Sequence, residues 1–337
     1  MSQPAGGPLL RPVPTGWKLW LAGARPRTLP AAVVPVIVGT AVAAGMRHGL
    51  LSGWISYGSV AQRDAAIAAL DPSRHGLKGL IIWRAVAAMI VALFIQIGTN
   101  FANDYSDGIK GTDNETRVGP IRLVGSGLKS PGAVKKAALA SFGVAAVAGL
   151  ALAAATTWWL LLVGVVCFAA GWLYTGGPKP YGYYGFGELF VFVFFGLVAT
   201  AGSTFVQLEW IPWMAVVCGV AVGALATALL VINNLRDIPT DTVAGKKTLA
   251  VRLGDQRTRI LYVVLMVVPY LCLPFIAGLG NRPVAVLAFA AIFVAQRPVI
   301  IVLSGARGPA LIPVLGRTGQ VQLVFGVLLA AGLFISG

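Results

Sequence analysis

The sequence is poor in charged residues. Only 11% of its 337 residues are charged and 57% are hydrophobic, whereas about a quarter of a typical soluble domain is charged. This composition excludes a soluble globular enzyme and a disordered chain. It is typical of a polytopic membrane protein, because only a lipid bilayer tolerates so much apolar surface.

Histidine and cysteine are also scarce, with two and three residues. The cysteines lie inside apolar stretches without CxxC spacing, which indicates packing and excludes a disulfide scaffold. So few histidines argue against a His-based metal site. The 26 Lys and Arg exceed the 11 Asp and Glu. No soluble stretch is long enough for a nucleic-acid-binding domain, so this excess indicates basic loops beside a bilayer. No segment points to an obligate protein partner.

Nine apolar stretches predict an all-α fold with nine transmembrane helices. The first 16 residues are rich in Gly and Pro, which predicts a disordered tail, and residues 17–24 predict a short interfacial helix. Residues 17–337 are expected to form a single membrane domain with a long outer segment at 47–80. The predicted spans are 29–46, 81–103, 134–156, 158–174, 186–206, 212–235, 259–279, 283–303 and 319–336.

The distribution of basic residues predicts the orientation of these spans. If the N-terminus is cytoplasmic and the nine spans alternate, 20 Lys and Arg fall on the cytoplasmic side and 6 on the outer side. Cytoplasmic loops of membrane proteins carry the excess of Lys and Arg. The sequence therefore predicts a cytoplasmic N-terminus and an outer C-terminus.

Acidic residues gather in two short clusters, each at the expected cytoplasmic end of a span. In the first, Asn103 and Asp107 are four residues apart; in the second, Asn233, Asp237 and Asp241 repeat that spacing. Residues four apart share one face of a helix, so each cluster presents oxygen ligands on one surface. Together the clusters contain six of the eleven carboxylates, namely Asp104, Asp107, Asp113, Glu115, Asp237 and Asp241.

Oxygen ligands of this kind favour a hard cation. Mg²⁺ prefers one or two carboxylates together with phosphate oxygens. Two such faces opposite each other would hold Mg²⁺ around a diphosphate, and the cation would neutralise the charge that develops when an allylic diphosphate ionises. The alternative is that the clusters are ordinary solvated faces. The repeated spacing on one side of the membrane favours the metal site.

The two acidic motifs resemble those of a known family. NDYSDGIKGTD at 103–113 and NNLRDIPTDTVAGKKTLAVRLG at 233–254 resemble the two Asp-rich motifs of the UbiA superfamily of intramembrane prenyltransferases. The resemblance covers roughly residues 17–337 and implies nine transmembrane helices. RPRTLP at 25–30 and YTGGPKPYGYYGFGE at 174–188 are similar to the branch that prenylates 1,4-dihydroxy-2-naphthoate in menaquinone biosynthesis.

The resemblance implies roles for individual residues. The first motif departs from the superfamily pattern, because Gly111 stands at its third position and the next acidic residue is Asp113. An aromatic face can also stabilise an allylic cation, which makes Tyr105 and Tyr174 candidates. Asn103, Asp107, Asp237 and Asp241 are expected to hold Mg²⁺, supported by Asn233 and Asp113, while Lys179, with Arg27, Arg117 and Lys246 as weaker candidates, is expected to bind diphosphate.

The implied activity is prenyl transfer in the plasma membrane, with the active site on its cytoplasmic side. The expected substrates are a polyprenyl diphosphate and an aromatic acid, and loss of the carboxylate of 1,4-dihydroxy-2-naphthoate would give a demethylmenaquinone. Another aromatic acceptor, such as 4-hydroxybenzoate or homogentisate, is one alternative. A cation-coupled transporter is another, but it would carry ionisable residues near the middle of several spans. Glu188, at the start of the fifth span, is a further functional candidate.

Overall fold

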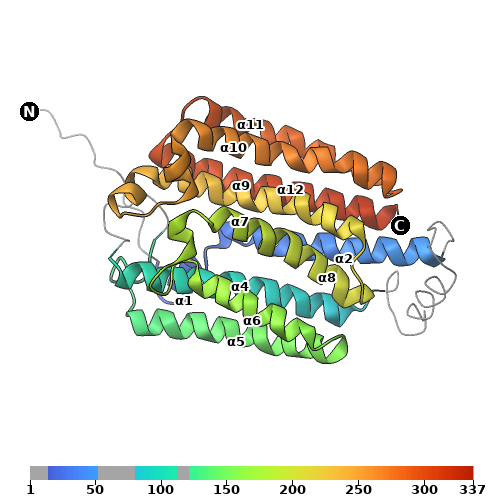
Figure 1. The fold of residues 1–337 in the computed structure, drawn as a ribbon, viewed down its shortest axis with the longest axis horizontal. Helices are drawn as coiled ribbons and strands as arrows, with labels where there is room; N and C mark the ends of the chain where they lie inside the picture. The colour runs from blue at the N-terminus through green and yellow to red at the C-terminus, as the bar shows by residue number, and fades with distance from the viewer. Residues whose placement is uncertain (1–13, 52–79, 112–120, 337) are drawn as a thin grey trace, which may run out of the picture.

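A computed structural model describes residues 14–51, 80–111 and 121–336, and the described residues form helices without any strand. The long helices run roughly parallel in one bundle (Figure 1). In chain order the elements are α1 (Trp17–Ala24), η1 (Pro26–Thr28), α2 (Pro30–Leu51), α4 (Ile82–Ile109), α5 (Pro131–Ala155), α6 (Trp159–Leu173), η4 (Tyr181–Tyr184), α7 (Gly187–Val191), η5 (Phe192–Val198), α8 (Ala199–Leu208), α9 (Trp213–Val243), α10 (Leu249–Pro274), η6 (Phe275–Leu279), η7 (Pro283–Ala291), α11 (Ile292–Leu303), η8 (Gly308–Leu311) and α12 (Ile312–Ile335).

The expected membrane bundle is confirmed, but not the number of spans. Within the described part of the chain, seven helical segments are long and apolar enough to cross a bilayer, and Trp17–Thr28 with Pro30–Met46, bent by 57°, would make an eighth. The 15 residues of α6 extend only about 22 Å, less than the roughly 30 Å hydrocarbon core. Nine spans therefore stay a prediction. The seven segments are Ile82–Ile109, Pro131–Ala155, Gly187–Leu208, Trp213–Val243, Leu249–Leu279, Pro283–Leu303 and Gly308–Ile335.

Two helices extend beyond the apolar stretches that predicted them. α4 continues to Ile109 and α9 to Val243, whereas the apolar patterns ended at 103 and 235. Both acidic motifs are therefore helical over most of their length, and each keeps its four-residue spacing on one helix face. The apolar pattern ended early because the last turns of both helices carry polar residues, and these residues face the interior of the bundle.

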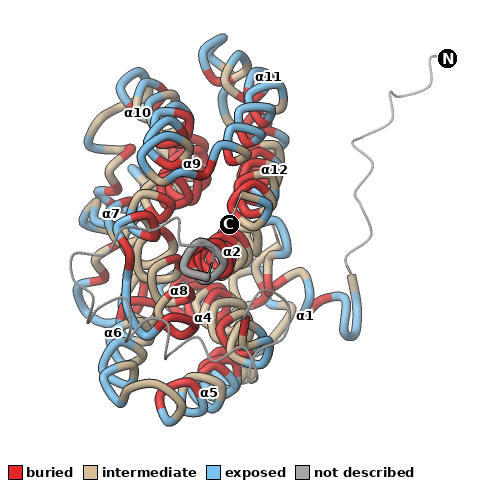
Figure 2. Tube along the Cα trace, turned by 90° about the vertical axis from the view of Figure 1, so that its right-hand side faces the viewer, coloured by how far each residue is buried: buried red, intermediate tan, exposed pale blue. Residues whose placement is uncertain are grey.

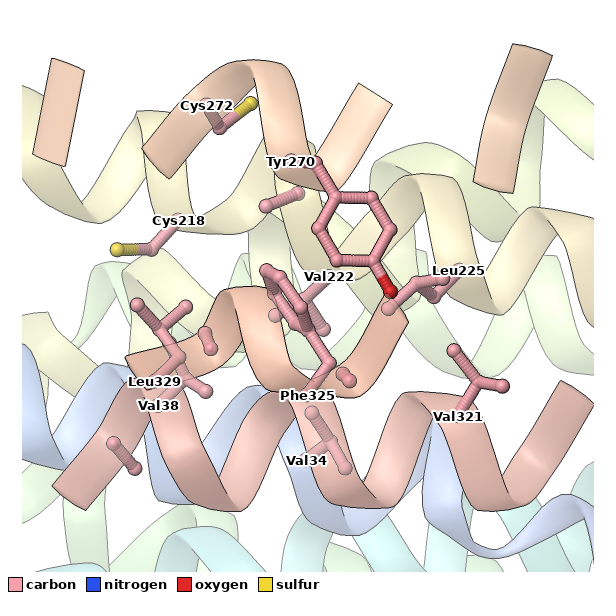
Figure 3. Packing of buried hydrophobic residues seen from close by; sticks show 14 of the residues in the cluster. Val34, Val38, Cys218, Val222, Leu225, Tyr270, Cys272, Val321, Phe325 and Leu329 are labelled. Carbon is pink, nitrogen blue, oxygen red and sulfur yellow. The ribbon is translucent and has the colours of Figure 1, made fainter. Parts of the chain in front are cut away.

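The largest core cluster lies where α2, α9, α10 and α12 meet (Figure 3). Val34, Val222 and Phe325 are fully buried there, and the Tyr270 ring meets Phe325 edge to face with centroids 5.7 Å apart. Figure 2 shows that burial is concentrated on α2, α9 and α12, while α5, α6 and α11 carry long exposed faces. In lipid, such a core is held by close van der Waals packing because lipid tails are as apolar as the side chains.

Glycines bring α9 and η5 into backbone contact. A Cβ on Gly196 of η5 would lie 2.5 Å from the Cα of Gly223 on α9. Small residues allow membrane helices to approach closely, and η5 is a π-helical segment, a distortion often found near functional sites. This contact holds the η5 segment, with its phenylalanines, against the helix that carries the second motif.

Side-chain contacts define the two ends of the bundle. At one end the ammonium of Lys246 lies 3.5 Å from the Asp107 carboxylate. At the other end the Arg282 guanidinium donates to the carbonyl oxygens of Gly45 and Ser336. The two acidic motifs therefore share one end of the bundle, opposite the C-terminus (Figure 1). Which end faces the cytoplasm stays a prediction.

Candidate functional site

A large internal cavity of about 1230 Å³ begins at the end of the bundle that carries both acidic motifs. Its lining on α4 runs from Asp107 to Ala88, a separation of roughly 28 Å along the helix. Polar residues line the motif end, and Val91, Leu160 and Val198 are among the apolar residues further along. The cavity thus joins a charged mouth to an apolar channel nearly as long as the hydrocarbon core is thick.

The first motif supplies two oxygen-bearing side chains to the cavity. Asn103 and Asp107 lie one turn apart on α4, and both are buried. The Thr175 hydroxyl donates to Asn103 Oδ1 at 2.9 Å, and the Tyr183 hydroxyl donates to Asp107 Oδ1 at 2.6 Å. The segment between α6 and α7 therefore orients both ligand candidates.

The second motif is organised around an arginine. Asn233, Asp237 and Asp241 line the same cavity from α9. Arg236 donates from Nε and Nη2 to the two carboxylate oxygens of Asp237 at 2.7 and 2.6 Å, and from Nη2 to Asn233 Oδ1 at 2.8 Å. A bidentate arginine–carboxylate pair is rigid and directional, so the buried Arg236 holds these oxygens in a set orientation.

Lys246 connects the two motifs. It follows α9, where its backbone N–H donates to the Asp241 carbonyl. Its ammonium lies 3.5 Å from Asp107 and 4.5 Å from the centroid of the Tyr183 ring. The Lys110 ammonium lies 5.2 Å from the same ring and donates to the Thr175 carbonyl. Two cations therefore flank one tyrosine at the point where the motifs meet.

The charges at the mouth suit a polyvalent anion. Burial lowers the pKa of Lys110; the Asp107 carboxylate opposes this shift and the Lys246 cation adds to it. A surplus of positive charge in a cleft attracts and concentrates anions. Among the described residues, the cavity lining contains five cationic side chains, those of Arg25, Arg27, Arg122, Arg236 and Lys246, against the three carboxylates of Asp107, Asp237 and Asp241.

The UbiA prenyltransferase family model matches residues 65–303. The chain belongs to this family. It is 47% identical to 1,4-dihydroxy-2-naphthoate octaprenyltransferase of Mycobacterium tuberculosis over 93% of this chain and 96% of the relative. It is 33% identical to the Escherichia coli protein of the same name, over 94% and 95% of the two chains.

Solved structures show the same fold. A UbiA homolog from Archaeoglobus fulgidus bound to GPP and Mg²⁺ superposes with a TM-score of 0.59, at 14% identity, over 94% of this chain and 99% of the homolog. A homolog from Aeropyrum pernix without ligand has a TM-score of 0.55 at 15% identity, over 90% and 97% of the two chains. The architecture around the cavity is therefore that of the UbiA family.

The oxygen donors of this family member fit Mg²⁺ when a phosphate shares the coordination. Within the described ranges, no group of three or more His, Cys, Asp or Glu side chains is close enough to hold a metal ion. Mg²⁺, however, is usually bound by one or two carboxylates with substrate phosphate oxygens. The cavity offers the carboxylates of Asp107, Asp237 and Asp241, and the cations in its lining can bind the diphosphate that would supply the phosphate oxygens.

An aromatic wall follows the charged mouth. The rings of Tyr181 and Phe190 stack with centroids 4.0 Å apart, Tyr174 meets Tyr181 at 5.5 Å, and Phe194 lies 5.7 Å from Phe190. All four residues line the cavity. The Tyr181 hydroxyl donates to the Ala170 carbonyl, and burial raises the pKa of this tyrosine. Such a wall offers π faces to an aromatic ring or to an allylic cation.

Two of the expected site residues lie away from the cavity. Tyr105 is about 200° around α4 from Asn103 at 100° per residue, and its ring contacts Trp172 and the Lys135 ammonium instead. Lys179 is exposed on the segment before η4 and is outside the cavity lining. Neither residue is therefore in the cavity lining, and their expected roles toward the substrate stay predictions. Asp113 and Arg117 lie outside the described residues.

Arg27, Tyr174, Asn233 and Lys246 do line the cavity, as the sequence-based assignment expected. Asp104, counted with the acidic cluster, has a different role. Its carboxylate accepts hydrogen bonds from the backbone N–H groups of Leu123 and Val124, at 2.8 and 3.1 Å. It therefore anchors the segment before α5 rather than facing the cavity.

Sequence reasoning missed three residues that orient the acidic groups. Arg236 lies three residues after Asn233, a spacing that shares one helix face and could have indicated that contact. It is adjacent to Asp237, a spacing that gives no such signal. Thr175 and Tyr183 are distant in sequence from the residues they contact. Only the conspicuous YTGGP segment and the tyrosines after it marked them.

Proposed function

We propose that this protein transfers a polyprenyl group from a polyprenyl diphosphate to 1,4-dihydroxy-2-naphthoate. Attack of a ring carbon on the allylic cation, with loss of the carboxylate as CO₂, would give a demethylmenaquinol, the reduced form of a demethylmenaquinone. The observation that carries the proposal is that both acidic motifs open into one cavity with a long apolar channel. The relatives named 1,4-dihydroxy-2-naphthoate octaprenyltransferase match nearly the whole chain and support the choice of acceptor.

Asp107, Asp237 and Asp241, with the amide oxygens of Asn103 and Asn233, would hold Mg²⁺ at the mouth. When bound, Mg²⁺ would stabilise the negative charge that develops on the leaving diphosphate. Lys246 and Arg27, which both line the cavity, would bind diphosphate oxygens directly. Donors arranged in advance around a developing charge lower the barrier to ionisation.

The apolar part of the cavity suits the polyprenyl tail. It would keep the tail in a lipid-like environment while the diphosphate remains at the polar mouth. The Tyr174 ring, which lines the cavity, would stabilise the allylic cation through its π face. The apolar lining would limit capture of that cation by water.

The cavity mouth is assigned to the cytoplasmic side of the plasma membrane. The support is the distribution of Lys and Arg, 20 against 6 under this orientation. The arrangement includes nine spans within a single membrane domain over residues 17–337, with α6 as the short span. It lets the charged substrates arrive from the cytoplasm and the tail from the bilayer.

The test is product analysis with purified protein in liposomes. The protein is incubated with polyprenyl diphosphates of several lengths and, separately, 1,4-dihydroxy-2-naphthoate, 4-hydroxybenzoate and homogentisate. The expected product has the mass of prenylated naphthoate without its carboxylate, and it disappears with excess chelator. Product from another acid alone would assign a different acceptor, whereas cation flux without any product would indicate the transporter.

A further inference from the structure

A buried polar pair lies beside the aromatic wall, and the proposed chemistry has not used it. Glu188 of α7 and Asn234 of α9 are only 5% and 6% exposed. The Asn234 amide nitrogen donates to Glu188 Oε1 at 2.9 Å, and Glu188 Oε2 is buried without a hydrogen-bond partner among the described residues. A buried ionisable group in a membrane bundle is costly to keep, so this pair requires a reason.

Glu188 determines which end of the Asn234 amide faces the cavity. A carboxylate can only accept hydrogen bonds, whereas an amide group has one donor end and one acceptor end. Because the NH₂ end faces Glu188, the carbonyl Oδ1 is directed to the other side. Asn234 is part of the cavity lining, so a carbonyl that faces away from Glu188 can be offered to the cavity as a neutral acceptor.

The neighbourhood of this carbonyl suits an aromatic ring. Tyr174 lies directly beside the start of α7: a Cβ on Gly187 would fall 3.1 Å from Tyr174 Cε2 and 3.4 Å from its hydroxyl oxygen. Tyr181 and Phe190 continue this wall. The cationic mouth is nearby, because Asn233, the preceding residue, is bonded to Arg236.

We propose that Asn234 Oδ1 accepts a hydrogen bond from a ring hydroxyl of the aromatic acceptor, and that Glu188 is the positioning residue that holds the amide in this orientation. The hydroxyl would lie against a neutral acceptor while the ring packs on Tyr174 and Tyr181. Donation of this hydrogen bond increases the electron density that the hydroxyl oxygen releases into the ring, which favours attack of a ring carbon on the allylic cation. This inference rests on the proposed prenyl transfer to a hydroxylated acid.

The test is Glu188→Gln. A glutamine side chain can donate to Asn234 Oδ1, so the amide can turn and direct its NH₂ group to the acceptor instead. The ring hydroxyl would then have to accept a hydrogen bond instead of donating one, and this mismatch should raise KM for 1,4-dihydroxy-2-naphthoate roughly tenfold. KM for the polyprenyl diphosphate should stay within about twofold. The matched control is Glu209→Gln, since Glu209 is exposed at the opposite end of the bundle, and it should leave both constants unchanged.

Inhibition measurements separate a hydrogen bond from general damage. 1-Hydroxy-2-naphthoate and 4-hydroxy-2-naphthoate, which each lack one hydroxyl, are tested as competitive inhibitors. In the wild-type protein one should bind about tenfold more tightly than the other, and in Glu188→Gln this preference should vanish. Such a cycle between a ligand group and a side chain isolates their coupling.

Three results would overturn the inference: an unchanged KM for the naphthoate, an equal rise in both KM values, or a preserved inhibitor preference. Asn234→Ala, which deletes the carbonyl, is the second variant and should abolish the preference in the same way. It decides the question if Glu188→Gln does not fold. Failure of the wild-type protein to prenylate the naphthoate at all would instead count against the proposed function.

Discussion

At the residue scale, the site depends on side chains that orient the acidic groups as much as on the acidic groups themselves. Asp107 is in contact with Tyr183 and Lys246, and Asp237 is held by Arg236. These carboxylates are buried close to cations, which offsets the cost of removing them from water. The same cations would remain available to a diphosphate if a metal ion bound the carboxylates.

Tyr183→Phe tests this orientation at one atom. It removes the 2.6 Å hydrogen bond to Asp107 Oδ1 and keeps the ring beside Lys110 and Lys246. A hydrogen bond to a charged group contributes about 1.5–3 kcal/mol, so kcat should fall by about tenfold or more. Steady-state kinetics in detergent checks this result, with KM for the acceptor expected to change little. The matched control is Tyr184→Phe, since Tyr184 is exposed; equal rates for the two variants would contradict the role of Tyr183.

The residue scale is also where the sequence was most informative. The four-residue spacing of Asn and Asp predicted which side chains share a helix face, and both motifs line the cavity. The same periodicity excludes Tyr105, two positions from Asn103, from that face. The direction of the Lys179 side chain could not be predicted in this way. Lys179 lies on a segment without helical periodicity, where sequence spacing does not determine which way a side chain points.

At the element scale, hydropathy located the helices but not their ends. The polar last turns of α4 and α9 carry no apolar signal, although they continue the helices to Ile109 and Val243. The sequence also did not predict the π-helical turn of η5 within the fifth span, Gly187–Leu208. This turn depends on how the backbone of η5 contacts α9. Local sequence does not specify such contacts.

Gly196→Ala tests the contact between η5 and α9. The added methyl would lie 2.5 Å from Gly223 Cα, and backbone atoms cannot yield without separating the two elements. Overpacking of this kind costs about 1–3 kcal/mol, so the thermal midpoint in detergent should fall by about 2–6 °C. Gly202→Ala is the matched control, since its Cβ would meet nothing within 4 Å. A Gly196→Ala protein as stable as the control would show that the close approach is unimportant.

At the scale of the whole molecule, the sequence predicted a membrane bundle whose two motifs face each other. The bundle is confirmed, with seven or eight candidate spans among the described residues. The size and course of the cavity could not be predicted from the sequence. They depend on the distance that packing leaves between one group of helices, α4, α5, α6 and η5, and the core of α2, α9 and α12. That separation is a property of the packed molecule.

The central claim is that both motifs bind one diphosphate through Mg²⁺. The most direct test is Mg²⁺-dependent binding of a polyprenyl thiolodiphosphate, which does not ionise readily, measured by calorimetry on the wild-type protein, Asp107→Asn, Asp237→Asn and the double variant. Each single change should weaken binding by tenfold or more, the double variant should lose little beyond that because the residues act as one site, and chelation of Mg²⁺ should abolish the differences. Fully additive losses, or binding that survives when either motif is altered, would contradict the account.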